Sequence, residues 1–296
     1  MIYLAYIFIA IFGAIIGSFS VAQVWRLRAA ELFQAKKSGE KIDSKEWKKL
    51  KHLAETKKVS DRSHCLNCGY HLKWYDLIPI FSWLSLGGKC RKCRKPIGWL
   101  EFLAEISTAI IFALVLWSLR IDFSNQISIL QAIKIAVLFS AISCLVILFI
   151  YDAKWSLLPV KQMTIFNILA AIFCAITLFE NGINFENIVN LAISLVAFPG
   201  IYLLLTVISK GAWVGDGDWI LALGLILLLP ASPVFAILML LFSNVIGLLM
   251  IFSAAIFRKT EIRRGEQIPF GPAMILAMLL LLIFQPFFEN LAIFLN

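Results

Sequence analysis

The feature that most constrains the fold of this chain is a series of long apolar runs that recur along most of its length. A transmembrane helix needs roughly 20 predominantly apolar residues. Eight segments approach or reach that length: 2–24, 102–119, 130–150, 162–179, 188–208, 219–232, 234–257 and 271–293. The chain is 61% hydrophobic, whereas a soluble domain is about half apolar. We therefore expect an all-α polytopic membrane protein with about eight transmembrane helices.

The distribution of basic residues predicts how these helices are oriented. Of the 27 Lys and Arg residues, 18 lie between Arg26 and Lys95. Cytoplasmic loops of membrane proteins are enriched in Lys and Arg, so this segment is expected inside and both chain ends outside. The first run lacks a basic n-region and a small-residue cleavage site, which favours a retained anchor over a signal peptide. A net charge of +9 can accompany nucleic-acid binding, but here it follows topology and we expect no nucleic-acid partner.

Four of the six cysteines form two C-x-x-C pairs in this basic segment. The pairs are Cys65 with Cys68 and Cys90 with Cys93, and 21 residues lie between them. This spacing is typical of a tetrahedral zinc site with four thiolates and no open catalytic position. Two disulfides are the alternative, which a reducing cytosol disfavours. We therefore expect a structural Zn²⁺.

These signals divide the chain into three predicted regions. They are a first transmembrane helix at 1–25, a cytoplasmic basic loop at 26–100 with a zinc-binding subdomain at 63–99, and a seven-helix membrane domain at 101–296. Within the loop, residues 28–62 mix Lys and Glu and predict a solvated helical hairpin or a partly disordered spacer.

The most unusual polar residues lie where apolar runs begin or end. Asp152 ends the third run, and Gly215, Asp216, Gly217 and Asp218 precede the sixth. A carboxylate at membrane depth is costly and is a functional candidate. The predicted topology puts both sites on the inner side. Two facing carboxylates tend to share one proton, so one can activate water while the other protonates a carbonyl. We expect Asp152 and one of the two later acids to form a catalytic pair.

Other hydrolytic chemistries fit the sequence less well. The chain has no H-E-x-x-H motif for a catalytic zinc. Its three histidines, His52, His64 and His71, all lie in the basic loop, which argues against a Ser-His-Asp triad at the membrane.

The chain resembles the type IV prepilin peptidases, a family of membrane aspartic proteases of the GxGD type. The resemblance covers nearly the full length apart from 28–62. It is carried by Gly17-Ser18-Phe19, the four-cysteine block from Ser63 to Trp99, Asp152 with Leu158-Pro159, Gly215 to Asp218, and Ile268 to Pro272.

This resemblance implies both an activity and a location. Asp152 matches the first catalytic acid of the family, and Asp218 matches the second, with Asp216 as the alternative. Members cut the short basic leader of prepilins and pseudopilins after a glycine at the cytoplasmic face of the bacterial inner membrane. They then methylate the new N-terminus with S-adenosylmethionine. The resemblance thus implies prepilin or pseudopilin substrates, a multi-pass location in the lipid bilayer, and a peptidase domain at 101–296.

Two other functions stay open at this point. One is an intramembrane aspartyl protease of the presenilin type, which Tyr151-Asp152 and Pro272-Ala273 also resemble. The other is a non-enzymatic scaffold or transporter with a zinc-stapled loop. Substrate identity and oligomeric state cannot be read from the sequence.

Overall fold

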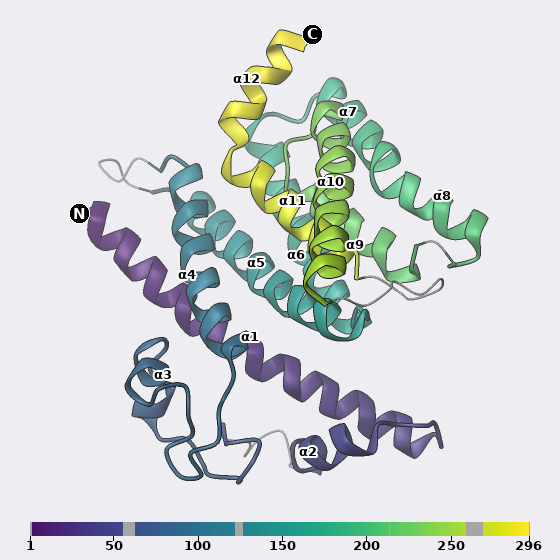
Figure 1. Ribbon diagram of the computed structural model, residues 1–296. Coiled ribbons are helices and arrows are strands. Elements are labelled where there is room, and N and C mark those ends of the chain that lie inside the picture. Colours follow the sequence, from purple (N-terminus) through teal and green to yellow (C-terminus); the bar gives the residue numbers. More distant parts are fainter. Residues whose placement is uncertain (1, 56–62, 122–126, 213, 259–268, 296) are drawn as a thin grey trace. The chain divides into compact units, whose positions relative to one another are not determined.

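The computed structural model describes residues 2–55, 63–121, 127–212, 214–258 and 269–295, and within these ranges the structure is almost entirely helical (Figure 1). Two isolated β-bridges are the only extended pairings in the described ranges. The predicted all-α class is therefore confirmed. The chain forms two compact units, Met1–Ala113 and Leu114–Asn296.

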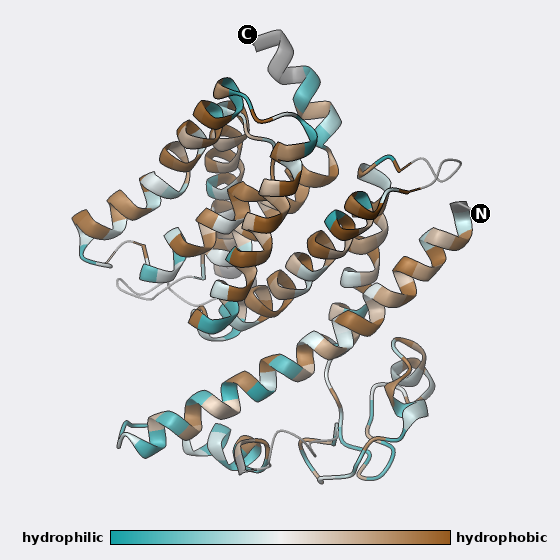
Figure 2. Ribbon diagram, turned by 180° about the vertical axis from the view of Figure 1, so that it is seen from behind, coloured by the Kyte–Doolittle hydropathy of each residue, from teal (hydrophilic) through white to brown (hydrophobic). Residues whose placement is uncertain are grey.

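The first unit begins with α1 (Ile2–Lys37), which is longer than the predicted first helix. Figure 2 shows its hydrophobic start giving way to a hydrophilic end. That end turns back into α2 (Ser44–Glu55), and the two helices enclose a small core of Ala29, Leu32 and Leu50. Arg28 joins them by an ion pair with Glu46, with 2.8 Å between Nη2 and Oε2. The predicted helical hairpin is thus present; residues 56–62 lie outside the described ranges.

Two glycines on α1 allow a close approach to α4 (Trp99–Ser118). A Cβ atom at Gly13 would lie 2.8 Å from the carbonyl oxygen of Thr108, and one at Gly17 would lie 2.6 Å from that of Ala104. Small residues four apart favour close packing of membrane helices. The segment between α2 and α4 carries η1 (Trp74–Leu77) and α3 (Phe81–Ser85).

The second unit is a helical bundle with α11 at its centre. Its helices are α5 (Ile129–Trp155), α6 (Val160–Glu180), α7 (Phe185–Ala197), α8 (Pro199–Ser209), α9 (Asp216–Leu227), α10 (Pro233–Arg258), α11 (Gly271–Ile283) and α12 (Gln285–Leu295). Eleven residues of α11 are buried, and it packs against α5, α9 and α10 (Figure 1). A helix that is apolar on all sides is expected at such a position.

Six helical stretches in the described part of the chain are long and apolar enough to cross a membrane: α1, α4, α5, α6, α7 together with α8, and α10. Two predicted spans are shorter than expected: α9 has 12 residues and α11 has 13. At about 1.5 Å per residue, neither alone crosses a hydrocarbon core of about 30 Å. The structure therefore supports fewer full-length spans than the eight expected. The basic residues between α10 and α11, Lys259, Arg263 and Arg264, lie outside the described residues.

Candidate functional site: a membrane aspartate site and a cysteine cluster

Asp152 lies in the last turn of α5 and is 4% exposed. Its Oδ2 atom accepts a hydrogen bond of 2.9 Å from the backbone N–H of Gly271, which is 119 residues away in sequence. A buried carboxylate needs such a partner because an unpaired charge in the interior is costly. The contact fixes Asp152 against the start of α11.

Gly271 can make this contact because it has no side chain. A Cβ atom at this position would lie 2.6 Å from Oδ2 of Asp152, well inside van der Waals contact. Gly271 is the first residue of α11, and Phe270 caps the helix. The segment around Pro269 and Pro272, part of the motif that carries the family resemblance, is therefore a helix start that presents its N–H to Asp152. Ile268 lies outside the described residues.

Asp218 lies in the first turn of α9, where Gly215 is the N-cap residue. Its Oδ2 atom accepts a 3.0 Å hydrogen bond from the Gly215 N–H. The positive end of a helix dipole favours a negative charge at this position. The carboxylate is half-buried, whereas Asp216, in the same turn, is exposed.

The second glycine of the G-x-G-D motif brings α9 close to the turn between α5 and α6. A Cβ atom at Gly217 would lie 3.0 Å from Cδ1 of Leu158. Pro159, which follows Leu158, is the N-cap of α6. Leu158 and the glycine motif, about 60 residues apart, are therefore in direct contact just beyond the end of α5, which carries Asp152.

The two acids interact electrostatically, since the charge of Asp218 acts on the Asp152 carboxyl. One lies at a helix C-terminus and the other at a helix N-terminus, and both accept a backbone N–H. Carboxyl groups in such a pair resist carrying two charges at once. The arrangement therefore favours one neutral and one ionised acid, which is the requirement for acid–base catalysis by paired aspartates. Sequence reasoning did not identify the N–H of Gly271, although the glycine between Phe270 and Pro272 was a signal.

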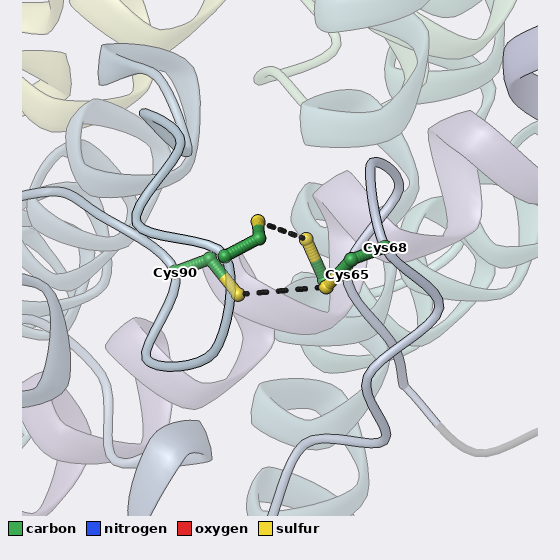
Figure 3. A group of neighbouring side chains, drawn as sticks. Cys65, Cys68 and Cys90 are labelled. Carbon is green, nitrogen blue, oxygen red and sulfur yellow. Dashed lines mark hydrogen bonds between the residues drawn. The ribbon is translucent and has the colours of Figure 1, made fainter.

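The four cysteines of the first unit form a separate cluster. The Sγ atoms of Cys65, Cys68, Cys90 and Cys93 all lie within 4.8 Å of one another. The Sγ atoms of Cys65 and Cys93 lie 4.0 Å apart, as do those of Cys68 and Cys90. Figure 3 shows Cys65 and Cys68 facing Cys90. A tetrahedral site with metal–sulfur bonds of about 2.3 Å has sulfur–sulfur edges of about 3.8 Å. The cluster could therefore hold a metal ion, and all six cysteines of the chain are free thiols.

The two knuckles have the same backbone. In each, the N–H of the first cysteine bonds to the carbonyl five residues later, at 2.9 Å, and its own carbonyl accepts from the residue four later. Those residues, Gly69 and Arg94, both have positive φ. Burial raises the pKa of the Cys65 thiol. Burial also acts to raise the pKa of the Cys90 thiol, but the backbone N–H groups of Cys93 and Lys92 donate to it and lower its pKa to about 7.

Comparison with known proteins gives a consistent result. Residues 11–119 match the family model described as "Bacterial Peptidase A24 N-terminal domain". The chain is 29% identical over 216 residues to a prepilin leader peptidase/N-methyltransferase of Dichelobacter nodosus, covering 73% of this chain and 68% of that protein. It is 38% identical over 100 residues to the protein of that name in Vibrio cholerae, covering 34% of this chain and 36% of the relative.

A third relative is the "type 4 prepilin-like proteins leader peptide-processing enzyme" of Escherichia coli O78:H11, 34% identical over 34% of this chain and 35% of the relative. In the Vibrio and Escherichia relatives the chain thus spans about a third of the protein's length. No solved structure matches the chain. The matched N-terminal domain and the named relatives therefore make this chain similar to the type IV prepilin peptidases.

Proposed function

We propose that this protein is a membrane-embedded aspartic endopeptidase that removes the short basic leader of prepilins or pseudopilins after a glycine. The observation that carries the proposal is the buried Asp152 carboxylate, held by Gly271 and acted on by the charge of Asp218. Relatives named as prepilin leader peptidases support the substrate class. The excess of basic residues between Arg26 and Lys95 supports a site at the cytoplasmic face of the bacterial inner membrane.

In this proposal the two acids have different roles. Asp218, half-buried in the first turn of α9, is the ionised partner and takes a proton from the attacking water. Asp152 is almost fully buried, which favours its neutral form. It keeps the hydrogen bond from Gly271 on Oδ2 and donates its proton to the scissile carbonyl oxygen. Water adds to the carbonyl carbon. The resulting diol returns a hydroxyl proton to Asp152 and collapses as the leaving nitrogen takes the proton held by Asp218. No covalent acyl-enzyme forms.

Asp218 is preferred to Asp216 as the second acid on three grounds. Asp216 is exposed, and it is Asp218 whose charge acts on Asp152. Asp218 also accepts the N–H of Gly215, which orients its carboxylate.

Substitution of each acid tests the proposal. Asp152→Asn and Asp218→Asn should each reduce cleavage of a co-expressed prepilin by at least about 1,000-fold, because each removes an essential proton carrier. Asn keeps an acceptor for the N–H of Gly271 or Gly215, so the fold is preserved. Asp216→Asn is the matched control and should cleave normally. If cleavage survives both Asp152→Asn and Asp218→Asn, the protein is instead a scaffold or transporter. If only Asp216→Asn abolishes cleavage, Asp216 and not Asp218 is the second catalytic acid.

We further propose that the new N-terminus is methylated, as the names of the relatives suggest for them. The first unit contains a pocket of about 240 Å³ lined by Trp25, Arg26, Lys49, Asp76 and Glu101, among others. This volume is below the usual range of ligand pockets, roughly 300–1,000 Å³. S-adenosylmethionine supplies an electrophilic methyl group when bound. The lining fits its chemistry: an indole face for adenine, cations for the carboxylate, and acids for the ribose hydroxyls and amino group.

The cysteine cluster has a structural role in this proposal. Cys65, Cys68, Cys90 and Cys93 would hold Zn²⁺, which supplies a tetrahedral cross-link between the two knuckles. All four positions are thiols, so no coordination site is open for substrate. The cluster and the family domain at 11–119 also favour a prepilin peptidase over a protease of the presenilin type.

A further inference from the structure

A buried tyrosine hydroxyl lies near the aspartate pair and has no role in the mechanism above. Tyr202, on α8, is 4% exposed. Its hydroxyl oxygen is buried and makes no hydrogen bond within the part of the chain that the structure describes. An unpaired hydroxyl in the interior costs free energy that a phenylalanine would not. A partner that arrives with substrate or water would offset this cost.

The ring of Tyr202 is held between two other aromatic rings. Its centroid lies 5.4 Å from that of Phe198 and 5.8 Å from that of Phe270. Phe270 directly precedes Gly271, the residue that donates to Asp152. The packing therefore ties Tyr202 to the start of α11, while α8 itself packs against α9, which carries Asp218.

Two polar groups lie near the Tyr202 hydroxyl. The charge of Asp218 acts on it, and the side chain of Asn244 is close to it without completing a hydrogen bond of normal geometry. The amide of Asn244 already donates to the carbonyl of Leu240 on its own helix, at 2.7 Å. Among the described residues, the Asp218 carboxylate accepts one hydrogen bond, from the N–H of Gly215. A carboxylate can accept more than one, so further acceptor positions remain.

We propose that Tyr202 is a positioning residue for Asp218: its hydroxyl donates a hydrogen bond, directly or through one water molecule, that orients the carboxylate toward the attacking water. This inference rests on the proposed peptidase function. Asp218 would then accept hydrogen bonds from two donors, the N–H of Gly215 and the hydroxyl of Tyr202. These donors would orient it as the N–H of Gly271 orients Asp152. A donor to the ionised form of a carboxylate also stabilises that form.

The test uses full-length protein in lipid nanodiscs and a prepilin substrate. Tyr202→Phe removes the hydroxyl and keeps the ring between Phe198 and Phe270. We expect kcat to fall by about 10-fold to 100-fold with KM within about twofold, because substrate binding is not altered. The acidic limb of the kcat/KM profile should move to higher pH, because Asp218 loses a donor to its ionised form.

Thr206→Val is the matched control. Thr206 is one helical turn later on α8, is equally buried, and its hydroxyl donates to the backbone carbonyl of Tyr202 at 2.9 Å. Removing this hydroxyl should leave kcat and the pH profile within about twofold of the unmodified protein. Asn244→Leu is the second control. If the Tyr202 hydroxyl served only to pair with Asn244 and stabilise the fold, then Asn244→Leu would have the same effect as Tyr202→Phe.

The outcomes separate this inference from the proposed function. If Asp152→Asn and Asp218→Asn both cleave normally, the peptidase assignment itself is wrong. If Asp218→Asn is inactive while Tyr202→Phe keeps an unchanged kcat and pH profile, Tyr202 is only a packing residue and this inference is overturned. Equal losses in Tyr202→Phe and Asn244→Leu, with no change in the pH profile, overturn it as well.

Discussion

At the scale of single residues, the site depends on glycines as much as on acids. Gly271 and Gly217 each stand where a β-carbon would overlap another side chain, at Asp152 and at Leu158 respectively. Neither needs a positive φ in this structure, so the requirement is space and not backbone freedom. Adding a methyl group at Gly271 therefore tests directly whether the geometry around Asp152 matters for catalysis.

We predict that Gly271→Ala reduces prepilin cleavage by about 100-fold. The new methyl group would displace the Asp152 carboxylate from the N–H of Gly271, and a misplacement of about 1 Å can cost that much. The measurement is the cleavage rate of purified protein, with thermal unfolding as a check on the fold. Gly200→Ala, on α8, is the control, because its nearest atom would be 3.5 Å from the new carbon. A variant Gly271→Ala with full activity would show that the Asp152–Gly271 contact is dispensable.

At the scale of structural elements, the two knuckles are short and have little apolar core of their own. Each is closed by two backbone hydrogen bonds and one isolated β-bridge. In so small an element, metal binding supplies free energy of folding. The thiols must lose their protons to bind the ion, so affinity depends on pH.

We predict that zinc is retained at pH 8 and that a chelator removes progressively more of it as the pH falls toward 5, because protons compete with the ion for the thiolates. In the metal-free protein the pKa of Cys90 is lowered to about 7, so this thiol is the readiest of the cluster to bind the ion near neutral pH. Burial raises the pKa of Cys65, so that thiol competes for protons even earlier. The measurement is the zinc content per chain after dialysis against a chelator between pH 5 and pH 8.

Two cysteine variants give this experiment its controls. Cys93→Ser should lose zinc at every pH, while Cys174→Ser, a buried thiol of the second unit, should retain it as the unmodified protein does. Zinc content that does not vary with pH, or that survives Cys93→Ser, would contradict a four-thiolate site.

The same elements illustrate how far sequence reasoning reached. Apolar runs and C-x-x-C spacing are local signals, so the helices and the cysteine cluster could be predicted. The ends of the helices were harder to predict. The first helix continues to Lys37 because its amphipathic end packs on α2, and hydropathy does not encode such a tertiary contact. The Gly271 contact to Asp152 joins positions 119 residues apart, and the role of Tyr202 depends on α8 lying against α9. Such long-range contacts are properties of the folded bundle.

At the scale of the whole molecule, the open question is how many helices cross the membrane. Both short helices, α9 and α11, begin at the aspartate site, and their N-terminal N–H groups are used there. If the site lies at the cytoplasmic face, each helix enters the bilayer from that side. The eight-span topology then requires the connection between α9 and α10, near Ser232, to lie outside, and the α8–α9 connection to lie inside.

We predict that a cysteine at position 232 reacts with a membrane-impermeant maleimide added to intact cells. Asn181→Cys, in the exposed connection after α6, should also react, because an odd number of spans separates it from the basic inner loop. Lys210→Cys, the exposed C-cap of α8, should react only after the cells are opened. Labelling of Asn181→Cys without Ser232→Cys would mean that α9 returns to the inner side. In that case α10 would also have to begin and end on the inner side, because Gly271 at the start of α11 contacts Asp152, and the eight-span topology would be wrong.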